Sequence, residues 1–97
     1  MDDRSASPPP TFSEFFAERY ARLVRACLLL TGSAAEGEDL AQEAMARTFE
    51  RWDRVSTMDD PEGYLYRTAL NLHQNAIKRL AMAARRRVAH TAIDEAE

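Results

Sequence analysis

The sequence predicts an all-α protein, a bundle of three long helices with room for one short extra helix in a loop. Three observations indicate this class. Apolar residues recur every three or four positions in three long segments, which is the period of an amphipathic helix. A residue suited to helix capping stands at the start of each segment. The strict alternation of apolar and polar residues that is typical of β-strands does not occur.

The first helix is expected to begin after Thr11. Thr11 and Glu14 have capping-box spacing, so each side chain can bind the other residue's backbone amide. Residues 1–10, which include three consecutive prolines, are predicted to form a disordered leader. Gly32 is expected to end the helix as its C-cap. The main buried stripe is predicted to contain Phe12, Phe16, Tyr20, Leu23, Cys27 and Leu30.

The second helix is expected to start directly after Ser33, which has capping-box spacing to Glu36. Acidic residues follow at once, and they suit the positive N-terminal end of a helix dipole. Gly37 is expected to weaken the first turn by up to ~1 kcal/mol relative to Ala. The helix is predicted to end near Asp53 or Arg54. Its buried stripe is predicted to contain Leu40, Ala41, Ala44, Met45, Thr48, Phe49 and Trp52.

Residues 53–60 are expected to form the one substantial loop before the third helix. Asp60 is the predicted N-cap of this helix, and Pro61 occupies the first helical position, which tolerates proline well. The spacing predicts a core seam through Leu65, Ala69, Leu72, Ala76 and Leu80.

Charge is distributed unevenly along the chain. Residues 34–62 carry nine acids and three bases, whereas residues 63–90 carry six bases and no acid, although the net charge of the chain is −3. The polar face of the third helix adds an aromatic ring and amides to this basic stretch, and Arg85–Arg87 extends it. Such groups can stack on bases, bind base edges and hold phosphates, so nucleic acid is one candidate partner. An ordinary solvated helix face followed by a basic tail is the other interpretation.

Several function classes are excluded. There is no catalytic serine, histidine and aspartate set, no glycine-rich phosphate loop and no cluster with metal-ligand spacing, so neither an enzyme nor a cofactor is expected. Cys27 is expected in the core, and His73 and His90 at the surface or its boundary. The longest apolar run is far too short to insert into a membrane. A cytoplasmic location is expected.

Two stretches, "EDLAQEAMARTFERWDRV" and "DPEGYLYRTALNLHQNAIKRL", resemble region 2 of bacterial RNA polymerase sigma factors of the extracytoplasmic-function (ECF) group. The resemblance covers residues 11–87, and the order and spacing of its short motifs make it specific. It implies a transcription initiation domain that recognises and melts the promoter −10 element. It also implies that acids on the second helix and bases on the third separate a polymerase-facing surface from a DNA-facing surface.

The resemblance assigns a role to particular residues. Asp39, Gln42 and Glu43 would dock on the clamp helices in the largest subunit of core RNA polymerase. The loop at about residues 53–61 would form a pocket for a flipped base of the non-template strand. The residues expected to bind DNA are Tyr64, Arg67, Asn71, Gln74, Asn75, Lys78, Arg79 and Arg54.

The domain division expected is a leader at 1–10, a sigma region 2 domain at 11–87 and the start of an acidic linker at 88–97. The second DNA-binding domain of ECF factors, which reads the −35 element, is not expected within this sequence. An anti-sigma factor is an expected further partner. The alternative function is a sigma-like helical module that binds polymerase or an anti-sigma factor without reading DNA.

Overall fold

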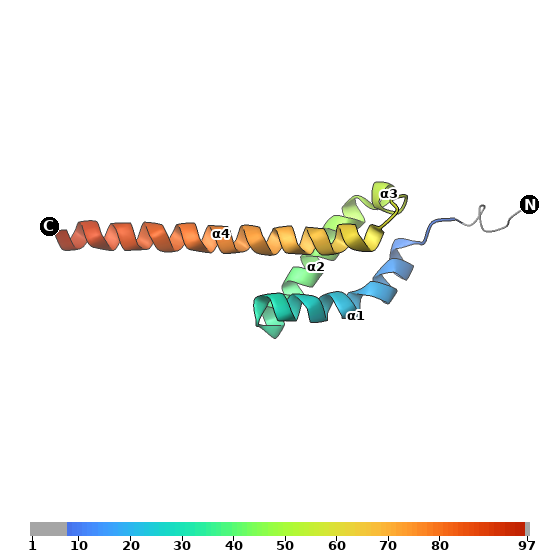
Figure 1. The fold of residues 1–97 in the computed structure, drawn as a ribbon, viewed down its shortest axis with the longest axis horizontal. Coiled ribbons are helices and arrows are strands. Elements are labelled where there is room, and N and C mark those ends of the chain that lie inside the picture. The colour runs from blue at the N-terminus through green and yellow to red at the C-terminus, as the bar shows by residue number, and fades with distance from the viewer. Residues whose placement is uncertain (1–7, 97) are drawn as a thin grey trace, which may run out of the picture.

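The computed structural model describes residues 8–96, which form helices and the connections between them. The helices are α1 (Phe12–Thr31), α2 (Ala34–Glu50), α3 (Trp52–Val55) and α4 (Pro61–Ala96). Figure 1 shows α2 crossing α4, with α1 beside α2 and the second half of α4 extending beyond both. The predicted all-α class with one short extra helix is confirmed. Most of the predicted leader, residues 1–7, lies outside the described residues.

Both ends of α1 are capped as its sequence predicts. The Thr11 hydroxyl accepts a hydrogen bond from the Glu14 amide at 3.2 Å, and the Glu14 carboxylate accepts one from the Thr11 amide at 3.4 Å. At the other end, Gly32 has a φ of 72°, which glycine adopts without steric cost. Its amide donates to the Leu28 carbonyl at 2.8 Å, closing the helix.

The α1–α2 turn is tight because Gly37 lies against the backbone of α1. A Cβ atom at Gly37 would lie 2.8 Å from Cα and N of Leu28, closer than any stable contact. The Ser33 hydroxyl accepts from the Glu36 amide at 3.3 Å and caps α2 just before this contact. Gly37 therefore does more than weaken the first turn, because its missing side chain lets the two helices approach.

The second helix ends earlier than predicted. It stops at Glu50, where Arg51 leaves helical geometry with φ −113° and ψ 20°. A separate short helix, α3, follows at Trp52–Val55 and buries Val55 completely. Asp53 and Arg54, expected near the end of the second helix, instead lie in α3.

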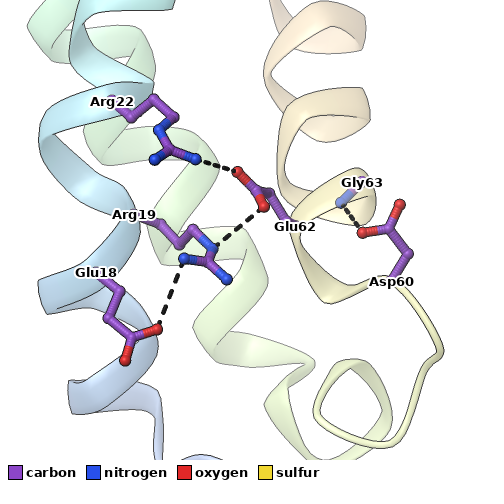
Figure 2. A network of polar contacts seen from close by, with 6 residues as sticks. All are labelled: Glu18, Arg19, Arg22, Asp60, Glu62 and Gly63. Atoms are coloured by element: carbon purple, nitrogen blue, oxygen red, sulfur yellow. Dashed lines mark hydrogen bonds and ion pairs between the residues drawn. The ribbon is translucent and has the colours of Figure 1, made fainter.

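The start of α4 is held by a cap and by ion pairs, which Figure 2 shows. The Asp60 carboxylate accepts from the Gly63 amide at 2.9 Å, so the predicted N-cap is confirmed. Glu62 lies between two arginines of α1, with its carboxylate 3.4 Å from Arg19 Nε and 3.5 Å from Arg22 Nη1. Such partly exposed pairs contribute only about 0–1 kcal/mol each, but they join α4 to α1 at a defined position.

The core lies where α1, α2 and the first third of α4 meet. It contains Phe15, Leu23, Cys27, Leu40, Ala41, Ala44, Met45, Leu65 and Ala69. Thr48 is also buried, and its hydroxyl donates to the Ala44 carbonyl at 2.9 Å, which satisfies it inside the helix. Three predicted core positions on α1 and α2 are wrong, because Phe16 is 38% exposed, Leu30 is 43% exposed and Phe49 is 60% exposed.

The predicted seam of α4 extends too far along the chain. Leu65 and Ala69 are buried and Leu72 is half-buried, but Leu80 is 68% exposed. The reason is that α2 crosses α4 rather than running along it (Figure 1), so Leu80 lines a hollow between the two helices and is not packed into the core. α4 nevertheless continues as one helix to Ala96, through the residues predicted to begin a linker. The domain boundary at residue 87 stays a prediction.

Candidate nucleic-acid interface

A groove of about 220 Å³ lies between the second half of α2 and the first half of α4. We call it the α2–α4 groove. It brings together three of the residues predicted to bind DNA, Tyr64, Asn71 and Asn75. Tyr64 is half-buried in its wall, whereas the two asparagines are exposed. Asn71 and Asn75 are four residues apart on a helix, so their amides project from neighbouring positions on one face.

The other predicted DNA-binding residues lie outside this groove. Arg67, Gln74 and Lys78 are exposed on α4, and none of them lines the groove. Their spacing of seven and four residues places them on a second face, opposite the buried Leu65 and Ala69. Arg54 is in α3, outside the groove lining. Arg79 is exposed farther along α4, beside acidic residues of α2.

Two arginines that were not predicted to bind DNA line the α2–α4 groove: Arg47 of α2, and Arg51, which directly follows the last residue of α2. Arg51 has left helical geometry, so the groove lining and not helical spacing brings the two arginines together. Arg47 pairs with Glu43 at 3.4 Å, and Glu50 is an acid in the groove wall. The sequence signal was the i, i+4 arginine spacing, but nothing in the sequence indicated that this end of α2 faces Asn71.

The chemistry of the groove suits a nucleotide. Arginine side chains bind phosphate oxygens and can stack on bases, and asparagine amides can donate to and accept from a base edge. An aromatic ring such as that of Tyr64 provides a stacking surface for an unpaired base. All three kinds of group line one groove here. The groove can therefore bind the phosphate backbone of a nucleic acid and distinguish one base from another at the same site.

The predicted polymerase-binding residues occupy two sides of α2. Asp39 and Glu43 line a hollow that also contains Asn75 and Arg79 of α4. Gln42 lies elsewhere, in an apolar patch with Phe12, Phe16, Met45, Ala46 and Phe49. The acids of α2 and the bases of α4 are therefore not fully separated, because residues of both helices line one hollow. The division into a polymerase-facing and a DNA-facing surface stays a prediction.

The loop predicted to hold a flipped base forms a hollow of its own against α1. Ser56, Met58 and Asp59 line it together with Phe15 and Arg19. Arg19 lies over the Phe15 ring, 5.9 Å from its centroid, and pairs with Glu18 at 3.6 Å. This hollow shares no residue with the α2–α4 groove. A base in the loop and a base in the groove would therefore occupy separate sites.

The structure raises the pKa of two titratable side chains, and burial is the main cause of both shifts. Burial raises the pKa of the Cys27 thiol, which is completely buried in the core as predicted. Burial and the nearby Glu62 carboxylate raise the pKa of Tyr66. His90 lies 3.5 Å from Asp94 on the exposed part of α4. Between residues 8 and 96, no three histidine, cysteine or acidic side chains are grouped so that they could hold a metal ion.

Comparison with known proteins assigns the family. The profile described as Sigma-70 region 2 matches residues 15–86, which include all the core and groove residues named above. The chain belongs to the sigma-70 region 2 family. The predicted resemblance to ECF sigma factors is thereby confirmed.

Two curated relatives, each named RNA polymerase sigma-E factor, come from Streptomyces coelicolor and Streptomyces avermitilis. Both are 32% identical over 60 residues, which is 62% of this chain and 34% of each relative. The match thus spans about a third of the length of these relatives. No solved structure matches the chain significantly. No helix among residues 8–96 is long and apolar enough to cross a membrane.

Proposed function

We propose that this chain is the part of a bacterial transcription initiation factor that docks on core RNA polymerase, melts the promoter −10 element and binds its non-template strand. Membership of the sigma-70 region 2 family supports this, as do relatives named RNA polymerase sigma-E factors. The observation that carries the proposal is the α2–α4 groove, because it combines amides, an aromatic ring and guanidinium groups.

In this proposal the groove holds one nucleotide of the melted strand. Removing a base from its stack costs a few kcal/mol, and stacking on an aromatic ring returns about 1–3 kcal/mol. Tyr64 would supply that stacking surface, and Asn71 would bind the base edge. Arg47 and Arg51 would bind the adjoining phosphates. The absence of acids from residues 63–90 keeps α4 from repelling the strand.

Docking on polymerase is assigned to the acidic half of α2. Asp39 and Glu43 are exposed and point away from the core, so they can pair with a basic surface without disturbing the fold. Gln42 would contact polymerase through a different part of α2, beside the exposed Phe49 ring. The clamp helices of polymerase would therefore have to contact both sides of α2 when they dock.

A second function is favoured by the apolar patch around Gln42. Phe49 is 60% exposed, and its ring lies 4.8 Å from that of Phe12. An exposed aromatic cluster fits a protein partner better than a phosphate backbone. In this alternative the chain binds polymerase or an anti-sigma factor and does not read DNA.

Selection from a randomised library of single-stranded oligonucleotides separates the two functions. The chain, alone and bound to core polymerase, is mixed with the library, and the retained pool is sequenced. A retained motif that depends on the bases of the non-template strand supports −10 recognition. Retention without any base preference, together with binding to polymerase, contradicts it and favours the interaction module.

A further inference from the structure

Glu62 lies at the start of α4, and two arginines of α1 hold its carboxylate (Figure 2). One carboxylate oxygen lies 3.4 Å from Arg19 Nε, and the other lies 3.5 Å from Arg22 Nη1. The two arginines are three residues apart on a helix, so they project from the same face of α1. Each oxygen of Glu62 therefore has its own partner, and the side chain is fixed at two points rather than through one rotatable contact.

Little else in the first turn of α4 can fix how the helix is rotated about its own axis. Pro61 precedes Glu62, and Gly63 follows it without a side chain. The Asp60 carboxylate accepts from the Gly63 amide at 2.9 Å, which closes the end of the helix but does not select the side that faces α1. Leu65 is completely buried, but apolar burial is non-directional. Among residues 8–96, the ion pairs of Glu62 are the polar side-chain contacts that join α4 to another helix.

The groove residues of α4 project from the side opposite to Glu62. Successive residues of an α-helix are about 100° apart around its axis, so Tyr64 lies ~200° and Asn71 ~180° from Glu62. Tyr64 and Asn71 line the α2–α4 groove, whereas Glu62 lines the loop hollow against α1 and is not part of the groove. A rotation of α4 that moves Glu62 away from α1 therefore also moves Tyr64 and Asn71 relative to the opposite wall of the groove.

A small rotation is enough to disturb a base contact. Side-chain tips lie roughly 5–6 Å from the axis of a helix, so a rotation of ~15° moves them by about 1.5 Å. A hydrogen bond to a base edge tolerates less than this, because its donor–acceptor distance lies within about 2.7–3.2 Å. The attraction between arginines and phosphates acts over a longer range and is less affected. The rotation of α4 should therefore influence base preference more than general affinity.

We propose that Glu62 is a positioning residue, which Arg19 and Arg22 hold so that the rotation of α4 about its axis is fixed. The fixed rotation directs Tyr64 and Asn71 toward the far wall of the α2–α4 groove. Glu62 acts from the other side of the helix and does not contact the base in this groove. The effect on base recognition rests on the proposed function, but the rotation itself is a property of the free chain and is tested without nucleic acid.

Nuclear magnetic resonance of the free chain tests the positioning. E62A removes both ion pairs, and because partly exposed pairs contribute little to stability, the variant is expected to fold. The side-chain amide signals of Asn71 and Asn75, more than two helical turns away, should shift. E18A is the matched control, because Glu18 lines the same hollow and pairs with Arg19 at 3.6 Å but with no residue of α4 within 8–96. It should leave both amide signals in place, and signals that stay in place in E62A as well would overturn the proposal.

Binding to single-stranded oligonucleotides adds a measurement that a purely structural role would not change. The base preference is the ratio of the affinity for a −10 oligonucleotide to the affinity for a scrambled one at the same salt concentration. E62A should raise the affinity for the scrambled strand because it removes an acid, and R19Q/R22Q should lower it because it removes two bases. Both variants should nevertheless lower the base preference by about fivefold or more, which is the lower end of what a bidentate base contact provides.

The triple variant R19Q/R22Q/E62A shows whether the three residues act as one unit. It should lose no more base preference than E62A alone, because either change already breaks the same contact. E18A should keep the wild-type preference. Losses that add up in the triple variant, or an E62A variant with the wild-type preference, would overturn the positioning role and leave the proposed function intact. A wild-type chain without any base preference would contradict the proposed function instead, and the amide signals of the free chain would still decide the positioning.

Discussion

Replacing Gly37 with alanine tests how closely α1 and α2 approach. Helix propensity alone favours alanine by up to ~1 kcal/mol. However, the new Cβ would lie 2.8 Å from Leu28 Cα and N and 3.0 Å from the Cys27 carbonyl carbon. These are backbone atoms of a neighbouring helix, so no side chain can rotate away to relieve the contact. Overpacking of this kind costs about 1–3 kcal/mol, which exceeds the gain in propensity.

We therefore expect G37A to lower the free energy of unfolding by about 1–2 kcal/mol. For a domain of this size, each kcal/mol corresponds to a fall in Tm of roughly 4–8 °C. Thermal unfolding followed by circular dichroism measures the change. A35G, at an exposed position in the same turn, is the matched control for propensity and should also destabilise the protein. An increase in the Tm of G37A would refute the close packing of α1 and α2.

Three further predictions concern charge. The double variant D39A/E43A should keep its helical content but lose co-purification with core RNA polymerase; unchanged retention would remove both residues from the docking surface. Because α4 is one continuous helix, Arg85 lies on the same face as Arg67 and Lys78, whereas Arg87 does not. If this face binds phosphates, R85A should reduce the salt dependence of binding to single-stranded DNA. The slope of log affinity against log salt should become shallower by up to about 0.7. R87A should change this slope less, and equal slopes would contradict the alignment. Burial raises the pKa of the Cys27 thiol, so this thiol ionises at a lower pH in the unfolded chain than in the folded one. The free energy of unfolding should therefore fall above roughly pH 8.5, where the unfolded chain gains the thiolate charge. C27A should show a shallower decline in urea unfolding between pH 8 and 10, and an identical decline would exclude the thiol as its cause.

The sequence predicted best those features that depend on neighbouring residues. The caps at Thr11 and Asp60 were correct because each bond joins residues three apart. Leu65 and Ala69 were correct core positions because the helical period places them beside each other. The same helical period also predicted that Leu80 is buried, and this prediction was wrong. Periodicity continues along α4, whereas burial stops where α2 crosses it.

The site was predicted only in part because it depends on how two helices cross. Tyr64, Asn71 and Asn75 share a helix, so their common face followed from spacing. The contribution of Arg51 did not, since it requires the end of α2 to lie beside Asn71. The proximity of Asp39 to Arg79 was missed likewise. Charge counts along the sequence separate acids from bases, but they contain no information about packing between segments.

The central claim is that the α2–α4 groove reads a base, and Asn71 tests it most directly. Gln74 is the matched control, because it is also an exposed amide of α4 but lies outside the groove. The affinities of N71A and Q74A for a −10 oligonucleotide and for a scrambled one are measured by fluorescence anisotropy at one salt concentration. N71A should lose about 1–3 kcal/mol of preference for the −10 sequence while keeping its affinity for the scrambled strand, and Q74A should keep both. Equal losses on the two oligonucleotides, or the same behaviour in both variants, would contradict base reading in the groove.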